Sequence, residues 1–405
     1  MRFKKLLRYI FGQYASVQKI AFYVNEEYMF DHYENILVCL DVDSFDLVLS
    51  DKFQSESYIE LINRLKSNSW NIQYLSDVIH KYKYRVFISH LYLGGNTTSA
   101  GTIFSRLINI CYKGLGKLFP KMKGKGSQQY VQSSLGAYNI RMMYGADSGV
   151  NSFYEYGNNY CELFDVFFCH GPRDAEITKS VFSKPIFIMG YPRYDNYFEL
   201  RDNSLNKDLL QEKYGLDRGK KTILWITTWA PHFSTIETYF KRMAMLVEHY
   251  NVIVRPHPLE IDPQYSRFNK SVFNLVTNGT FILSDNRYQD MTELYLVSDH
   301  VFCDYGASIF CALYMDKRIV LLNHKDVEKD LVASTSTSME ARDHLPSVNQ
   351  DEDDLLDYLV MDWVLFDHNR QGARKYYFGD INVDASKRAA KYLTNCLDPK
   401  LCVES

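Results

Sequence analysis

Short apolar runs alternate with segments of helical spacing along most of the chain. Runs of this length are typical of buried parallel strands, and the segments between them predict helices that cover the sheet. In the first half, strands are expected at Ile36–Asp41, Asn71–Leu75, Arg85–His90, Tyr138–Tyr144, Leu163–Cys169 and Pro185–Met189, with helices at Ser57–Lys66 and Pro172–Phe182. This alternation predicts a parallel sheet with helices on its faces.

The same pattern repeats after a polar stretch, Arg201–Lys221, which is interpreted as the connection between two domains. Strands are expected at Thr222–Thr227, Asn251–Arg255, Thr280–Leu283 and His300–Cys303, with helices at Thr235–His249, Asp290–Val297, Ile309–Met315, Asp351–Asp362 and Asp384–Asn395. The predicted fold class is α/β, with two doubly wound Rossmann-like domains facing each other across a cleft. The expected boundaries are 1–200, 201–380 and a C-terminal helix or tail at 381–405, with ligands at the carboxyl strand ends.

Length and charge limit the function classes. A chain of 405 residues is too long for one ordinary core, and its net charge of −3 argues against a general nucleic-acid binder. The eight cysteines form no CxxC pair, which favours buried free thiols over disulfides.

Residues 1–22 combine basic side chains with apolar ones at helical spacing. Such a segment could lie on an anionic membrane surface, or it could pack on the protein. Lys113–Lys125 is a second basic stretch, either a solvated loop or a further membrane contact. No apolar run is long enough to span a membrane. The sequence therefore predicts a cytoplasmic protein and leaves peripheral attachment to the inner face of the plasma membrane open.

The turn after the His300–Cys303 run is the first candidate site. It reads Asp304, Tyr305, Gly306, Ala307 and Ser308. The glycine lets the backbone approach a ligand, and the serine is a candidate N-cap for the next helix. A strand-to-helix turn with free amides suits a phosphate, although an ordinary βα turn would look similar.

Two further strand ends in the second half carry polar groups. Arg255 and His257 alternate with prolines in a VRPHP segment. A fixed guanidinium suits phosphate, and an imidazole can donate a hydrogen bond or carry a proton. Thr228 and Trp229 end another strand and could line a nucleotide pocket, or form a turn with a packed indole.

The first half offers candidate bases at two turns. Tyr144-Gly145-Ala146-Asp147 follows one expected strand, and Cys169-His170-Gly171-Pro172 follows another. Asp147 or His170 could deprotonate an acceptor hydroxyl, or either could cap a helix. The chain contains no Walker A, GxGxxG, GxSxG or HExxH motif and no metal-ligand spacing, so neither a metal nor a cofactor is expected.

Four motifs in order resemble the CDP-glycerol glycerophosphotransferase family, the teichoic-acid and capsule polymerases with a GT-B-like fold. The matching segments are GYPRYDNYF (Gly190–Phe198), ILWITTW (Ile223–Trp229), VRPHP (Val254–Pro258) and DMTELYLVSDHVFCDYGASIF (Asp290–Phe310). They cover roughly half of the chain.

The resemblance implies a site for the donor pyrophosphate in the second domain. Arg255 and His257 would contact the pyrophosphate, Ser308 and nearby amides would complete its cradle, and Asp290 and Arg193 match further positions of the motifs. Three departures stand out. Tyr144 replaces the usual histidine of a His-Gly turn, Gly306-Ala307 removes one hydroxyl, and Ala230 follows Trp229 where an arginine is usual.

The resemblance implies a transferase that moves a polyol phosphate from a CDP-activated donor to a cell-surface glycan. The expected partners are a nucleotide-activated donor and a lipid-linked or oligosaccharide acceptor, without a separate cofactor. Two alternatives stay open: a GT-B glycosyltransferase that uses a nucleotide sugar, and a non-catalytic member of a capsule-assembly complex. The missing histidine motivates the first alternative, and the altered Tyr144 together with Gly306-Ala307 motivates the second.

Overall fold

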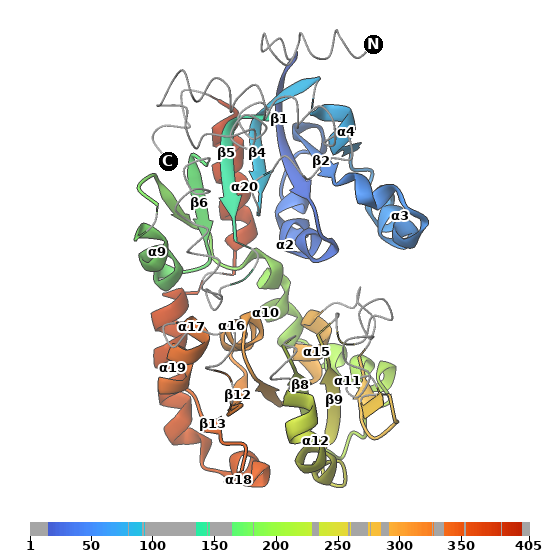
Figure 1. The fold of residues 1–405 in the computed structure, drawn as a ribbon, viewed down its shortest axis with the longest axis vertical. Coiled ribbons are helices and arrows are strands. Elements are labelled where there is room, and N and C mark those ends of the chain that lie inside the picture. Colours follow the sequence, from blue (N-terminus) through green and yellow to red (C-terminus); the bar gives the residue numbers. More distant parts are fainter. Residues whose placement is uncertain are drawn as a thin grey trace, which may run out of the picture.

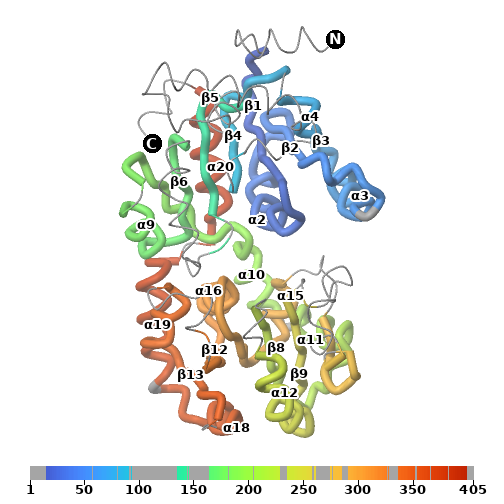
Figure 2. The backbone as a smooth tube through the Cα atoms, viewed as in Figure 1, coloured from blue at the N-terminus to red at the C-terminus, as the bar shows by residue number. Residues whose placement is uncertain are grey.

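The computed structural model shows two α/β domains stacked end to end, with the N-terminal domain at the top of Figures 1 and 2. The residues that the structure describes are 15–79, 81–90, 93, 135–143, 145, 164–180, 182–228, 235–257, 260, 274–275, 277–284, 291–325, 327, 336–351, 354–381 and 383–398.

The first domain contains a seven-stranded parallel sheet in the order β3-β2-β1-β4-β5-β6-β7. Its strands are β1 (Ala15–Val24), β2 (Phe45–Leu49), β3 (Ile72–Tyr74), β4 (Tyr82–Ser89), β5 (Gly136–Met142), β6 (Val166–Cys169) and β7 (Ile186–Ile188). The helices that accompany them are α2 (Glu27–Val38), α3 (Ile59–Ser67), α4 (Leu75–Val78) and α9 (Pro172–Lys179), with 3₁₀ turns at Val42–Ser44, Asp51–Gln54 and Glu56–Tyr58.

The second domain contains a six-stranded parallel sheet in the order β10-β9-β8-β11-β12-β13. Its strands are β8 (Thr222–Ile226), β9 (Asn251–Arg255), β10 (Ile282–Leu283), β11 (His300–Cys303), β12 (Arg318–Leu322) and β13 (Ser347–Val348). The remaining helices are η7 (Pro192–Tyr194), α10 (Asp195–Arg201), α11 (Ser204–Lys213), α12 (Thr235–Leu246), α15 (Met291–Val297), α16 (Ala307–Tyr314), α17 (Thr337–Glu340), η10 (Ala341–Asp343), α18 (Leu355–Val360), α19 (Trp363–Phe378) and α20 (Ala385–Leu397).

Both sheets are covered on both faces. In β8, Leu224 and Ile226 pack in one apolar cluster with α15 and α16, while Ile223 and Trp225 pack in another with α12 and α18. Strand β1 is divided in the same way between two clusters. Side chains that alternate between two buried faces explain why these strands read as continuous apolar runs. The predicted fold class, two doubly wound Rossmann-like domains, is confirmed.

The chain passes between the domains twice. Tyr191, Tyr194 and Tyr197 belong to the core of the second domain, so the first crossing lies before α10. The predicted connection Arg201–Lys221 is therefore wrong, because it contains α11, whose Leu210 packs against that core. After α19 the chain returns, and α20 places Tyr392 and Leu393 in the core of the first domain, where Figure 1 shows it beside β5. The C-terminal helix of the predicted tail is therefore packed against the N-terminal sheet.

Two local predictions were wrong. The segment Ile36–Asp41 is not a strand, because its first half ends α2, whose Met29, Tyr33 and Ile36 pack against β1. The second is the helical pattern of residues 1–22 from residue 15 onward, since residues 15–24 form β1, an inner strand of the sheet in which Ile20 to Val24 are all buried. Residues 1–14 and Lys113–Lys125 lie outside the described residues.

Candidate functional site

The candidate donor site lies at the carboxyl edge of the second sheet. Strands β9, β8 and β11 are neighbours there, which places Arg255, Thr228 and Asp304 on adjacent strand ends. The backbone also links them, since the Thr227 amide donates to the Arg255 carbonyl over 3.3 Å. Three motifs that are far apart in the sequence therefore meet at one edge.

Asp304 holds this edge together. One of its carboxylate oxygens accepts hydrogen bonds from the amides of Thr228 (2.8 Å) and Tyr305 (2.7 Å), and the other accepts from the Thr235 hydroxyl (2.7 Å). The side chain has no solvent exposure. Burial raises the pKa of Asp304 to about 6, against the lowering effect of these hydrogen bonds. Asp304 therefore joins β8, β11 and α12 rather than offering a free carboxylate to a ligand.

The turn from β11 to α16 requires a glycine. Gly306 has φ +91° and ψ −168°, a region that essentially only glycine adopts, and it is the N-cap of α16. Its amide donates to the Ser338 hydroxyl over 3.0 Å. The prediction that Ser308 is the N-cap was wrong, because the helix begins at Ala307 and Ser308 lies in its first turn. The amides of Ala307 and Ser308 begin the helix, where amides have no intrahelical acceptor.

Arg342 supports the turn from behind, and sequence reasoning missed it. Its guanidinium donates to the carbonyls of Asp304 (2.7 Å) and Ser338 (2.5 Å) and lies 4.1 Å from the centre of the Tyr305 ring. The Nε atom donates to the side chain of Asn323 over 2.7 Å. Arg342 is 38 residues from Asp304 in a segment without a recognisable motif, so no local pattern could have identified it.

Arg255 and His257 extend the edge from β9. Arg255 is buried and donates to the Ser284 carbonyl (2.9 Å) and hydroxyl (3.3 Å) at the end of β10. Burial, followed by the charge of Arg255, lowers the pKa of His257 to about 4. The imidazole is therefore neutral near pH 7, and a bound anion would favour its protonated form.

The carboxyl edge of the first sheet contains His170. The ring is buried, its centre lies 4.1 Å from that of Tyr191, and its Nδ1 lies 3.5 Å from a carboxylate oxygen of Asp174. Within the described residues neither ring nitrogen has a hydrogen-bond partner. The backbone amide of His170 donates to Asp174 over 3.2 Å. His170 is thus an interior residue next to the crossing between the domains.

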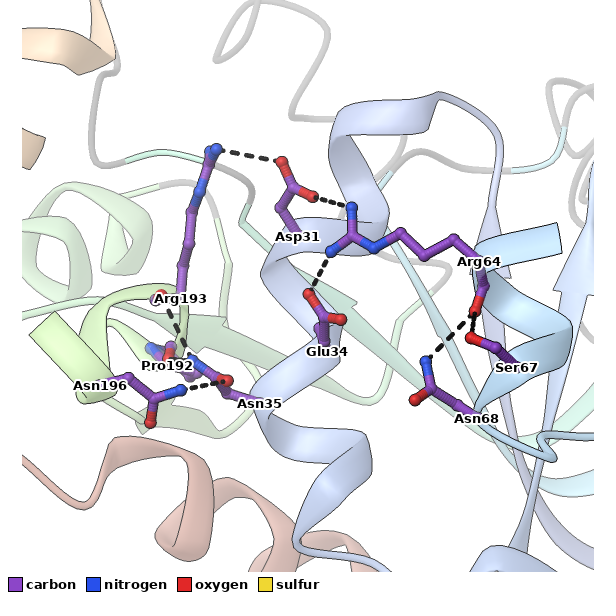
Figure 3. A network of polar contacts seen from close by, with 9 residues as sticks. All are labelled: Asp31, Glu34, Asn35, Arg64, Ser67, Asn68, Pro192, Arg193 and Asn196. Carbon is purple, nitrogen blue, oxygen red and sulfur yellow. Dashed lines mark hydrogen bonds and ion pairs between the residues drawn. The ribbon is translucent and has the colours of Figure 1, made fainter. Parts of the chain in front are cut away.

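Arg193 lies at that crossing, where its side chain extends toward Asp31 of α2 (Figure 3). Its guanidinium donates to Asp31 of α2 over 3.1 Å and lies 3.4 Å from His32 Nε2. Asn35, one turn further along α2, donates to the carbonyls of Pro192 and Arg193. The described contacts of Arg193 connect the domains, and its predicted donor contact stays a prediction.

The two carboxyl edges meet at small residues. A Cβ atom added at Gly145, just after β5, would lie 2.9 Å from the Cβ of Ala307. At Gly171 an added Cβ would lie 2.0 Å from the carbonyl oxygen of Tyr377 at the end of α19. Residues without a side chain therefore allow the first-domain turns to contact the second domain at the start of α16 and the end of α19.

Four predicted site residues lie outside the described part of the chain, namely Tyr144, Asp147, Trp229 and Asp290. Among the described residues, no cluster of three or more histidine, cysteine or acidic side chains could hold a metal ion. The five cysteines that the structure describes, Cys39, Cys169, Cys303, Cys311 and Cys396, are free thiols. Of the described helices, none is long and apolar enough to cross a membrane.

Comparison with known proteins identifies the family. The family model for CDP-glycerol:poly(glycerophosphate) glycerophosphotransferases matches residues 119–375, more than half of the chain. The chain belongs to this family. The resemblance drawn from the four motifs is confirmed, and the match includes the residues of the candidate donor site from Thr228 to Ser308.

Two curated members of the family are teichoic acid poly(glycerol phosphate) polymerases. The one from Bacillus spizizenii is 30% identical over 167 residues, which is 38% of this chain and 39% of that protein. The one from Bacillus subtilis is 29% identical over 156 residues, 36% of this chain and 19% of that protein. The matches thus span well under half the length of these relatives.

Two solved structures have the same fold as this chain. The wall teichoic acid polymerase TagF superimposes with a TM-score of 0.61 at 14% identity, covering 100% of this chain and 99% of that one. A protein described as a UDP-N-acetylglucosamine 2-epimerase from Listeria monocytogenes gives 0.54 at 12% identity, covering 96% and 97%. At these identities the likeness concerns the fold alone.

Proposed function

We propose that the protein is a transferase that moves glycerol phosphate from CDP-glycerol to a teichoic acid or related surface glycan. The observation that carries this proposal is the family match over residues 119–375, which joins both carboxyl edges in one match. The arrangement of Arg255, His257 and the α16 amides at adjacent strand ends supports it, since each suits an anionic donor.

In the proposed reaction an acceptor hydroxyl attacks the β-phosphorus of CDP-glycerol. A new bond forms between that phosphorus and the acceptor oxygen, and the bond to the bridging oxygen breaks. CMP leaves with the electron pair, and the hydroxyl proton passes to a base. Arg255, protonated His257 and the amides of Ala307 and Ser308 would stabilise the charge on the pyrophosphate oxygens.

Two side chains of the first domain are candidates for the base. The ring of His170 is buried against Tyr191 and Asp174, a position that an acceptor hydroxyl does not reach without movement of the surrounding residues. We therefore assign the base to Asp147, which follows Gly145 by two residues in the sequence. Since Gly145 lies against Ala307, a base so near to it along the chain could reach the donor phosphate.

The acceptor and the location belong to the same proposal. A lipid-linked or oligosaccharide acceptor of the teichoic acid or capsule type would come from the first-domain side. The basic residues that precede β1, Arg2, Lys4, Lys5 and Arg8, would hold the protein to anionic lipids at the cytoplasmic face of the membrane. No separate cofactor enters the reaction, because CDP-glycerol itself supplies the activated group.

The test is a turnover assay with CDP-glycerol, CDP-ribitol and a panel of UDP- and GDP-sugars, in the presence of a glycerol-phosphate oligomer. We expect CMP release and chain extension with CDP-glycerol, a loss of at least about 100-fold in Asp147→Asn, and a much smaller loss in His170→Asn. Arg218→Ala, which changes an exposed second-domain arginine, is the control.

Release of a nucleoside diphosphate from a nucleotide sugar would instead establish a glycosyltransferase. Absence of turnover, with all donors, would favour the non-catalytic alternative.

A further inference from the structure

A cavity of about 390 Å³ lies in the second domain at the edge opposite the donor turn. Its lining includes Lys221, His300 and Arg318, which stand at or just before the amino ends of β8, β11 and β12. The donor residues follow the carboxyl ends of the same sheet, so β11 separates His300 from Asp304 by roughly 13 Å at about 3.3 Å per residue. The cavity is therefore distinct from the donor site.

Cationic groups outnumber acidic ones in the lining of this cavity. Its six cationic side chains are Arg201, Lys207, Lys221, Lys317, Arg318 and Arg370, against three acidic ones, Asp299, Asp316 and Asp367. A volume of this size falls within the range of small-molecule sites. The composition indicates a ligand with negative charge.

Half of the cations have acidic partners and half do not. Lys207 pairs with Asp299 over 3.0 Å, Arg370 pairs with Asp316 and Asp367, and Arg201 donates to the neighbouring Asp202. Lys221, Lys317 and Arg318 make no ion pair with a described carboxylate.

Two of these three side chains, Lys317 and Arg318, can offer a positive charge to a ligand in the cavity. Lys317 donates to the Ser298 carbonyl over 2.9 Å, and the Arg318 guanidinium lies 5.4 Å from the centre of the Trp363 ring. Burial lowers the pKa of Lys317 to about 7. A nearby anion would restore the charge of this ammonium and offset the free energy that its burial costs.

His300 provides an independent indication of a ligand. The side chain lines the cavity and is 1% exposed, and neither ring nitrogen has a hydrogen-bond partner among the described residues. The Nε atom of Arg370, also buried, likewise has none there. Buried polar groups are nearly always hydrogen-bonded, so these atoms point to a partner that the described residues do not supply.

We propose that this cavity binds the phosphate group of a small phosphate ester, with Lys221, Lys317 and Arg318 providing the charge and His300 a hydrogen bond. A phosphate offers several acceptor oxygens, which matches a ring of donors around one space. The volume exceeds that of inorganic phosphate and accommodates a polyol attached to it. The phosphate could come from solution as a free monoester, or from a phosphodiester unit of a glycerol-phosphate chain, and the latter source rests on the proposed function.

The test is calorimetric titration of the full chain with inorganic phosphate, glycerol 3-phosphate and a short glycerol-phosphate oligomer, with chloride at matched ionic strength as the control. Lys221→Gln is the main variant, because Lys221 is exposed and its loss leaves the packing intact. Lys66→Gln, at an exposed position of α3 in the other domain, is the matched control. Arg318→Gln is the second variant.

We expect binding of at least one phosphate ester, weakened about tenfold in Lys221→Gln and in Arg318→Gln, which corresponds to the loss of one charged hydrogen bond. Lys66→Gln should bind these ligands as the wild type does. Stronger binding of the monoester would identify a free metabolite as the source, and stronger binding of the oligomer would identify the polymer. Absence of binding, or equal binding by the wild type, Lys221→Gln and Arg318→Gln, would overturn the proposal. Because no arm of this test requires transfer activity, its failure is distinguishable from failure of the proposed function.

Discussion

The carboxyl edges of the two sheets face each other, but they are built from different kinds of groups. At the second-domain edge, the Asp304 carboxylate accepts hydrogen bonds from two backbone amides and a hydroxyl, and Arg342 donates to the Asp304 carbonyl. At the first-domain edge, His90 and His170 are buried close to Arg141 and Tyr191. One edge is organised around a hydrogen-bonded carboxyl group and the other around buried imidazoles.

The comparison shows how burial acts on groups of opposite charge. It raises the pKa of Asp304 to about 6 and lowers that of His90 to about 3, in the second case assisted by the charge of Arg141. In both cases burial disfavours the ionised form. At the second-domain edge, hydrogen-bond donors offset the burial of the Asp304 carboxylate. The first amides of α16 lie at the same edge, where they could bind a ligand. The first-domain edge keeps its described histidines in the interior.

The largest effect that separates the two edges is expected at Asp304. Asp304→Ala would leave the amides of Thr228 and Tyr305 and the Thr235 hydroxyl without an acceptor. We expect a loss of about 3–5 kcal/mol in the free energy of unfolding, since each unsatisfied buried group costs about 1–3 kcal/mol. Denaturant titration checks this. Asp304→Asn keeps one accepting oxygen and should lose less than half as much, and equal losses in both variants would contradict the assigned role.

A smaller effect is expected at Gly306. A side chain at φ +91° and ψ −168° is strained, so Gly306→Ala should lower the free energy of unfolding by about 1–3 kcal/mol. Because the amides of Ala307 and Ser308 would shift with the turn, affinity for CDP-glycerol should fall as well. Gly372→Ala, at a helical glycine with open space around it, is the matched control for stability and binding. An unchanged affinity for CDP-glycerol in Gly306→Ala would show that this turn does not contribute to donor binding.

The pH dependence of stability sharpens the same comparison, with an effect no larger than that at Gly306. The pKa of Asp304 is raised from 3.8 to about 6 in the folded protein, so the fold binds the proton more tightly than the unfolded chain does. This contribution is present at low pH and is lost as pH rises through about 6. Asp304→Asn has no such proton, so its stability relative to the wild type should improve by roughly 1–3 kcal/mol between pH 4 and pH 7. A difference that stays constant over this range would contradict the raised pKa.

Sequence reasoning predicted the strands of the second-domain edge better than the contacts between distant segments, for a physical reason. Strands β9 and β11 coincide with the predicted Asn251–Arg255 and His300–Cys303, because buried parallel strands followed by Gly, Pro or charged turns leave a local pattern. Contacts between distant segments leave none. Arg342 was missed for that reason, and so was the pairing of Arg193 with Asp31 of α2.

The two wrong secondary-structure predictions in the first domain have a related cause. Strand β1 is buried on both faces from Ile20 to Val24, so it lacks the strict alternation of a half-exposed strand, and its basic flank suggested a surface helix. The run at Ile36–Asp41 is apolar because α2 packs against that strand. Short apolar runs of this kind do not distinguish a strand from a buried helix end.

The most direct test of the account is calorimetric titration of CDP-glycerol into the wild type, Arg255→Ala and His170→Asn. The donor is assigned to the second-domain edge, so we expect Arg255→Ala to weaken binding at least about tenfold, as expected for the loss of a charged hydrogen bond. His170→Asn should leave the affinity unchanged. Wild-type affinity in Arg255→Ala together with weakened binding in His170→Asn would place the donor at the first-domain edge and contradict the account.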